Sequence, residues 1–259
     1  MNYFISADVA QRYAAARPNF HPLVVARIVD ATGTSRFGHA LDVGCGTGQS
    51  SRALADICET VEAIDVSREM IARASPHDRV RYHVAAAEYL PFLDCQFDLI
   101  TVGLAFHWFD QPSFLREARR MLKIGAWLVI YNHGFKGEME ENPDFHAWFS
   151  AAYAKCFPTP QRGSLTPLPE LAAVHGFEIV ATEAIANDKS MSPQALAAYL
   201  ATQTNVIAAV EASELSFEAA ERWIAAEVTP FLIGQTGRMK FSGEIRCLRR
   251  LESRLSDRP

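Results

Sequence analysis

The sequence predicts an α/β fold with a doubly wound, mostly parallel sheet, on the basis of three features. Apolar segments of strand length alternate with segments of helical periodicity through the first half of the chain. The strand-length segments are apolar throughout, which is typical of parallel strands covered by helices on both faces. The first of these strands, residues 39–43, runs directly into a glycine-rich turn at residues 44–48. In such a sheet, ligands bind at the carboxyl ends of strands where the strand order reverses.

The elements of the first half follow from local signals. A helix begins near Ser6 and ends before Pro18, because the residue before a proline avoids helical dihedral angles. Ser67 is a favourable N-cap, and Glu69 lies in the first turn of the helix that follows it. The predicted strands are 39–43, 60–64, 80–85, 97–102 and 126–131, and the predicted helices are 21–31, the segment after the glycine turn, 68–74 and 112–122.

Beyond Asn132 the regular alternation stops. Helices are expected over 144–156, 168–175, 193–210 and 217–231, and strands over 177–185 and 241–248. The composition does not change sharply anywhere along the chain, and there are no internal repeats. We therefore expect one domain over residues 1–259, with a cofactor-binding core in 1–135 and acceptor-side helices and terminal strands in 136–259.

Composition restricts the class of partner. The 259 residues include 49% apolar and 21% charged residues, which is ordinary for a globular protein. The net charge of −5 argues against nucleic acid as a partner, because a phosphate backbone demands a basic face. Small molecules are therefore more plausible partners than nucleic acid. The five cysteines contain no C-x-x-C pair, so neither a zinc site nor a disulfide framework is expected.

The chain start has no basic n-region, and no apolar run approaches the roughly 20 residues of a membrane span. We therefore expect a cytoplasmic protein that is neither exported nor inserted in a membrane. The sequence leaves the oligomeric state open.

The turn after the first strand carries the clearest functional signal. Gly44, Gly46 and Gly48 remove Cβ atoms, so that backbone amides can approach a bound molecule closely. A dinucleotide fingerprint requires G-x-G-x-x-G, but Gln49 stands where the third glycine would be. The pattern is instead G-x-G-x-G, preceded by Asp42.

The second strand ends in Asp65, at about the distance along the chain that is typical of a carboxylate bound to ribose hydroxyls. No basic residue adjoins Asp65 to accept a 2′-phosphate. The glycine turn and the acid Asp65 together predict a site for a nucleoside.

Residues 41–48 (LDVGCGTG) resemble the first motif of the class I S-adenosylmethionine-dependent methyltransferases, without a gap. Two further segments, Tyr13-x-x-x-Arg17-Pro18-x-Phe20 and residues 107–109 (HWF), resemble the trans-aconitate methyltransferase-like (methyltransferase type 11) subgroup. The resemblance implies a Rossmann-like seven-stranded sheet that ends in an antiparallel pair, with a helical lid and S-adenosyl-L-methionine as cofactor.

The resemblance also implies roles for individual residues. The turn at Gly44, Gly46 and Gly48 would hold the methionyl end, and Asp42 would either bind its amino group or cap the turn. Asp65 would hold the ribose. The candidates for contact with adenine are Ser67, Met70, Ala86, Ala87 and Glu88. Met70 is equally suited to the hydrophobic core, and Glu88 could instead brace the loop. Many relatives have an acid where this chain has Ala86, which departs from the family pattern. Leu104 would lie near the methionyl chain, and the segment of Tyr13 would fold over the cofactor.

Methyl transfer is an in-line displacement that needs alignment and dryness but no metal. His107 is either a general base or an orienting histidine. A carboxylate acceptor needs a cationic clamp, for which Arg17 is the first candidate and Arg12 the second. His133 is a further candidate for the acceptor pocket, and Arg246, Arg249, Arg250 and Arg254 are expected on a solvated face.

The leading hypothesis is methylation of a small molecule, with O-methylation of a carboxylic acid as the first guess. Transfer to carbon or nitrogen stays open. The alternatives from other classes are an NAD-binding oxidoreductase and a non-catalytic S-adenosylmethionine-binding protein.

Overall fold

The computed structural model describes residues 4, 6–160, 168–213 and 215–252. The chain forms two compact units. The first comprises residues 1–18, 133–163 and 186–242, and the second comprises 19–132, 164–185 and 243–259. These units are defined by compactness and not by function. The predicted split between a cofactor-binding core in 1–135 and acceptor-side elements in 136–259 therefore stays a prediction.

The strands form one mixed sheet in the order β3-β2-β1-β4-β5-β8-β6, and β7 pairs with β8 as an eighth strand of the described chain. The neighbours β1 to β5 pair in parallel. The strand order reverses between β1 and β4, which is the place where such sheets bind ligands. The strands are β1 Phe37–Val43, β2 Cys58–Asp65, β3 Val80–Val84, β4 Phe97–Gly103, β5 Leu122–Met139, β6 Phe177–Ala186, β7 Lys189–Met191 and β8 Gly237–Arg250.

The last two long strands are antiparallel, as expected. Leu251 N–H donates to Gly176 O at 3.0 Å, and Asn187 N–H donates to Phe241 O at 2.9 Å. Residue numbers therefore rise along β6 while they fall along β8. The predicted doubly wound sheet is confirmed, with β7 added to the seven expected strands.

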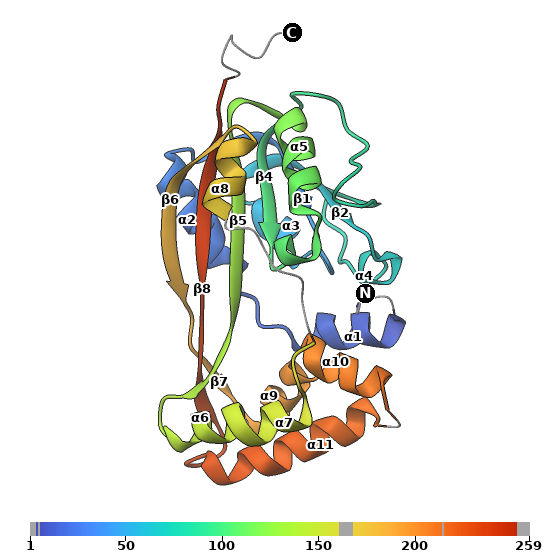
Figure 1. Ribbon diagram of the computed structural model, residues 1–259, viewed down its shortest axis with the longest axis vertical. Helices are drawn as coiled ribbons and strands as arrows, with labels where there is room; N and C mark the ends of the chain where they lie inside the picture. The colour runs from blue at the N-terminus through green and yellow to red at the C-terminus, as the bar shows by residue number, and fades with distance from the viewer. Residues whose placement is uncertain (1–3, 5, 161–167, 214, 253–259) are drawn as a thin grey trace. The chain divides into compact units, whose positions relative to one another are not determined.

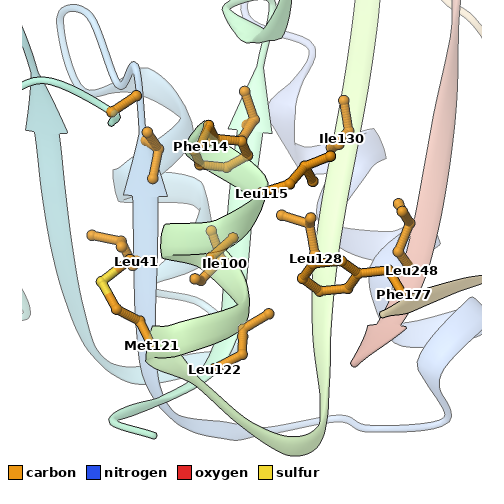
Figure 2. Packing of buried hydrophobic residues seen from close by; sticks show 14 of the residues in the cluster. Leu41, Ile100, Phe114, Leu115, Met121, Leu122, Leu128, Ile130, Phe177 and Leu248 are labelled. Atoms are coloured by element: carbon orange, nitrogen blue, oxygen red, sulfur yellow. The ribbon is translucent and has the colours of Figure 1, made fainter. Parts of the chain in front are cut away.

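In the unit of residues 19–132, 164–185 and 243–259, helices cover both faces of the sheet (Figure 1). Helices α2 (His21–Thr32) and α3 (Gln49–Leu54) pack on one face, and α5 (Gln111–Met121) and α8 (Leu168–Val174) pack on the other. Figure 2 shows the packing of α5, with Phe114, Leu115 and Met121 against Leu41, Ile100 and Leu128 of the strands. This burial on both sides explains why the strands are apolar throughout.

Local caps set the ends of several helices. Asp110 caps α5 by accepting the Ser113 N–H at 2.8 Å. Gly33 ends α2 in the left-handed conformation, with φ 64°. Ser67 caps the short helix α4 (Arg68–Ile71), and its hydroxyl accepts the Met70 N–H at 3.2 Å. The cap at Ser67 is as predicted, but α4 ends three residues before the expected Ala74.

The other unit is built on an aromatic-rich core. Its helices are α1 (Ala7–Ala16), α6 (Asp144–Trp148), α7 (Ala154–Cys156), α9 (Pro193–Leu200), α10 (Thr204–Glu211) and α11 (Phe217–Val228). A π-helical turn, η2 (Phe149–Tyr153), joins α6 to α7, and a 3-10 turn, η3 (Thr229–Phe231), follows α11. Among the described residues, no helix has both the length and the apolar character needed to cross a membrane.

Several boundaries differ from expectation, among them the end of β5 at Met139 rather than 131, and two differences have a visible local cause. The helix expected over 193–210 is broken into α9 and α10, because Thr202 turns its hydroxyl back to Tyr199 O at 2.6 Å and Gln203 caps α10 in an extended conformation. Strand β5 begins at Leu122 rather than 126, because it continues through Gly125 at φ 74° beside a register shift opposite β4. In a sequence pattern, a glycine such as Gly125 suggests the end of a strand, so the strand was predicted to begin after it.

Candidate functional site

The glycine turn after β1 is folded over the carboxyl end of β2. Gly44, Gly46 and Gly48 have φ values of 73°, 55° and 75°, a region that favours glycine. The Gly44 and Cys45 N–H groups donate to Ile64 O at 2.8 and 2.9 Å, and Gly46 N–H donates to the Asp65 carboxylate at 2.9 Å. These amides were expected to face a ligand, but in the structure they hold the turn to β2.

Glycine is also required at two positions by the packing of the protein itself. A Cβ at Gly44 would collide with the Cβ of Ala105 and lie 3.3 Å from Cζ of Phe109. A Cβ at Gly48 would lie 2.7 Å from Cε1 of Tyr82. At Gly46, by contrast, it would meet only Met70 Cε at 3.6 Å, an ordinary contact. The chain segments that approach the turn come from β3 and from the end of β4.

Asp65 joins the turn to α4. Its Oδ2 accepts the Gly46 N–H at 2.9 Å, and its Oδ1 accepts the Ser67 N–H at 2.8 Å. Burial raises the pKa of Asp65, and the backbone N–H donors partly oppose that rise. A carboxylate oxygen can accept two hydrogen bonds, so each oxygen retains capacity for a ligand hydroxyl. Met70 is buried, with 4% of its surface exposed, in the first turns after this acid.

Asp42 is an internal brace. Its side chain is buried, and it accepts hydrogen bonds from Ser50 Oγ at 2.5 Å, Ser51 Oγ at 2.7 Å and Thr101 Oγ1 at 2.8 Å. Burial raises the pKa of the Asp42 carboxyl, and the three hydroxyls oppose that rise. This arrangement favours the turn-capping interpretation of Asp42 over direct contact with a ligand. Sequence reasoning missed the three hydroxyls, although the serine pair directly follows the glycine turn.

The exit of β4 is held in an unusual backbone conformation. Leu104 has φ 58°, which is rare for a residue with a branched side chain. Its N–H donates to Tyr131 O at 3.0 Å, and the Tyr131 ring packs so closely on Gly103 that a Cβ there would lie 2.7 Å from Cε2. The Tyr131 hydroxyl bonds His21 Nδ1 at 3.1 Å. No sequence motif identified Tyr131 or His21 as part of this region.

The aromatic segment after β4 divides into packed and exposed residues. Phe109 packs against Phe114 of α5 with ring centroids 5.1 Å apart, so plain packing accounts for it. His107 and Trp108 lie in the 3-10 turn η1 (Phe106–Trp108), with ring centroids 4.8 Å apart. Trp108 is 37% exposed. The role of His107 stays a prediction.

The loop after β3 is tied to the start of α5. Glu88 Oε1 accepts the Asp110 N–H at 2.9 Å, which matches the bracing alternative for this residue. Ala87 is buried in the core beneath α5, and Ala86 O accepts the Tyr89 N–H at 3.3 Å. Contacts of these three residues with adenine stay predictions.

Tyr13, predicted to lie over the cofactor, and the predicted acceptor-side residues Arg17 and His133 belong to the other unit. The Tyr13 ring lies over the Arg17 guanidinium, 4.5 Å from centroid to Cζ. His133 is buried and stacks on Phe241 at 5.8 Å. Burial, followed by the charges of Lys136 and Lys189, lowers the pKa of His133 to about 4.

The C-terminal arginines are only partly the solvated face that was expected. Arg250 donates from Nη1 to Leu122 O and to Cys95 Sγ, and its Nε is buried. Arg249 is exposed and donates to Gly125 O at 3.3 Å. Arg246 pairs with Glu244. Arg254 lies outside the described residues.

No group of three His, Cys, Asp or Glu side chains within the described ranges is placed to hold a metal ion.

Comparison with known proteins agrees with this geometry. Residues 41–130 match the Methyltransf_11 family model, a methyltransferase domain. A malonyl-[acyl-carrier protein] O-methyltransferase of Enterobacter lignolyticus is 34% identical over 130 residues, which are 47% of this chain and 52% of that protein. The chain spans about half the length of the curated relatives it matches.

Solved structures share the fold. A protein of Anaeromyxobacter dehalogenans, described as a candidate type II methyltransferase, aligns with TM-score 0.70 at 24% identity, over 92% of this chain and all of that one. A phosphoethanolamine N-methyltransferase of Haemonchus contortus, solved with S-adenosylhomocysteine, aligns with TM-score 0.56 at 17% identity, over 96% of this chain and 58% of that one. Residues 41–130 thus match a methyltransferase domain, which confirms the predicted resemblance to the class I S-adenosylmethionine-dependent methyltransferases over that part of the chain.

Proposed function

We propose that this protein is an S-adenosyl-L-methionine-dependent methyltransferase that acts on a small-molecule acceptor. One observation carries the proposal. Within the matched methyltransferase domain, the Asp65 carboxylate at the end of β2 is hydrogen-bonded to the glycine turn that follows β1. An acid and a side-chain-free turn at a strand switch point are the two parts that a nucleoside site needs.

The cofactor role of Asp65 is supported by its unused hydrogen-bonding capacity, which suits the two hydroxyls of a ribose. Ser67 and Met70 follow Asp65 closely and are proposed for the adenine side. We propose that the edge of the adenine ring lies against the loop after β3, at Ala86, Ala87 and Glu88. Because the amides of the turn are engaged with β2, Gly44, Gly46 and Gly48 would contribute space rather than donors to the methionyl end.

The bound cofactor supplies an activated methyl group on a sulfonium. The chain would contribute alignment of the acceptor and exclusion of water. Leu104, held in its left-handed conformation by Tyr131, is proposed beside the methionyl chain. His107 is proposed as a base only for acceptors that must lose a proton.

The acceptor class that we propose is a small carboxylic acid, methylated on oxygen. A carboxylate is already nucleophilic at neutral pH and needs only to be held and desolvated. The relatives include malonyl-[acyl-carrier protein] O-methyltransferases, and this similarity supports O-methylation. Amine and carbon acceptors belong to the same test.

Calorimetric titration with S-adenosylhomocysteine, and separately with NAD, tests the cofactor. We expect saturable binding of the first and none of the second, and the reverse result would favour an oxidoreductase. Transfer of labelled methyl to a panel of carboxylic acids, phenols, amines and carbon acceptors then tests catalysis. Tight cofactor binding with no labelled product from any acceptor would instead indicate a non-catalytic binding protein.

A further inference from the structure

Helix α1 and its C-cap residue include two arginines with different surroundings. Arg12 is paired with Asp8 at 3.0 Å, with Glu221 at 2.6 Å and with Glu218. Arg17, just past the helix end, has no carboxylate partner within the part of the chain that the structure describes. Three carboxylates therefore offset the charge of Arg12, whereas none of the described carboxylates pairs with Arg17.

The Arg17 guanidinium lies close to two aromatic rings. Its Cζ lies 4.5 Å from the ring centroid of Tyr13 and 5.2 Å from that of Tyr199. Such cation–π contacts stabilise the cation but accept none of its N–H hydrogen bonds in the way that an oxygen does. The donors of a guanidinium lie in its plane, so they still require acceptors.

Only one edge donor has an acceptor among the described residues. Arg17 Nη2 donates to Thr202 O at 2.8 Å. The Arg17 Nε–H is buried and has no acceptor within those residues. Leaving a buried charged donor unsatisfied is costly, so a planar anion that accepts from this edge would be favoured.

The surroundings of this cation are aromatic. Tyr153 is buried, and its hydroxyl accepts a hydrogen bond from Asn205 Nδ2 at 3.3 Å. Burial raises the pKa of Tyr153, and the charge of Arg17 opposes that rise. Tyr153 ends the π-helical turn η2, in which its ring stacks on Phe149 at 4.7 Å. π-helical turns occur frequently at functional sites.

We infer that Arg17, between Tyr13 and Tyr199, binds the carboxylate of a monocarboxylic acid with a flat, apolar body. A carboxylate accepts in the plane of the guanidinium, where donors are unused, and the rings of Tyr13 and Tyr199 suit an aromatic or unsaturated body. That this ligand is the methyl acceptor rests on the proposed function. The anion site itself rests only on the contacts of Arg17.

Benzoate is the probe, and benzamide is its neutral isostere. In the full-length protein, we expect calorimetric binding of benzoate and none of benzamide. The nitrogen-15 spectrum of arginine Nε–H groups should show one resonance that shifts saturably with benzoate. That resonance should be absent from the Arg17→Lys spectrum and present in that of Arg12→Lys.

Arg17→Lys keeps the charge but removes the planar fork, so benzoate affinity should fall by roughly tenfold or more. Arg12 was the second candidate for the acceptor clamp, but Asp8, Glu218 and Glu221 already engage its guanidinium. Arg12→Lys is therefore the matched control and should bind benzoate as the unmodified protein does. Equal binding of benzamide, or unchanged benzoate affinity in Arg17→Lys, would overturn the inference. If Arg17→Lys does not fold, Arg17→Gln replaces it both in the assignment of the resonance and in the benzoate titration.

Binding of S-adenosylhomocysteine to the same samples separates this inference from the proposed function. Intact cofactor binding without benzoate binding overturns the anion site alone. Benzoate binding without any cofactor binding overturns the acceptor role and leaves the anion site. If Arg17→Lys loses affinity for S-adenosylhomocysteine and not for benzoate, Arg17 serves the cofactor and the acceptor assignment is wrong.

Discussion

The Asp65 carboxylate accepts the backbone N–H of Gly46 at 2.9 Å, so the acid that ends β2 and the turn that follows β1 are directly joined. The other oxygen of Asp65 accepts the Ser67 N–H, which also fixes the start of α4. A single side chain therefore orders the turn, the end of β2 and the first turn of the next helix. A ligand that binds to Asp65 meets an acid whose orientation is already set.

Replacing Asp65 with alanine should weaken S-adenosylhomocysteine binding by about 1–3 kcal/mol, because charge-assisted hydrogen bonds to ribose hydroxyls are lost. Calorimetric titration measures the change. Asp56→Ala, at an exposed acid between α3 and β2, is the matched control and should bind normally. Unchanged affinity in a folded Asp65→Ala protein would remove Asp65 from the proposed cofactor contacts.

Gly44→Ala should destabilise the protein more than Gly33→Ala. Both glycines have positive φ, but a Cβ at Gly33 meets nothing within 4 Å, whereas one at Gly44 collides with Ala105. The difference in free energy of unfolding should be about 1–3 kcal/mol, which is the usual cost of overpacking. Urea denaturation measures both variants.

Adding Ala105→Gly to Gly44→Ala should recover part of the loss, because it removes the atom that the new Cβ meets. If the double variant is no more stable than Gly44→Ala alone, the close approach of Ala105 is not what requires glycine at this position.

Thr101→Val should lower the free energy of unfolding by about 1–3 kcal/mol, because it withdraws one of three hydroxyls from the buried Asp42 carboxylate. The valine preserves shape, so the change isolates the hydrogen bond. Thr60→Val, at an exposed residue of β2, should have an effect within about 0.5 kcal/mol. Equal effects of the two variants in urea denaturation would argue against Asp42 as a brace.

His133 should make the protein less stable in acid. Burial lowers its folded-state pKa to about 4 from an ordinary 6.5, so the unfolded chain binds more protons between these values. Stability from the neutral imidazole is complete above about pH 6.5 and is lost as the pH falls toward 4, with a slope of at most about 1.4 kcal/mol per pH unit. Urea denaturation across this range, compared with His133→Gln, measures the contribution. Parallel curves for the two proteins would contradict it.

Local sequence was sufficient for much of the fold and for the position of the site. The apolar strands, the N-cap at Ser67 and the end of α1 before Pro18 each depend on neighbours along the chain, which sequence patterns report directly. The glycine turn and the acid at Asp65 are likewise local signals, at the ends of β1 and β2. These two features predict a nucleoside site, and the resemblance of residues 41–48 to a known motif indicates the family.

Other properties were decided by contacts between residues far apart in the chain. Thr101 reaches Asp42 across 59 positions, and Leu104 is held in its left-handed conformation by a strand that follows it. Arg12 and Arg17 have the same side chain, but Glu218 and Glu221 neutralise only Arg12. Hydrogen bonds and charge pairing depend on distance in space rather than along the sequence. Tertiary structure alone therefore determines which amide, acid or guanidinium is already satisfied and which is left to a ligand.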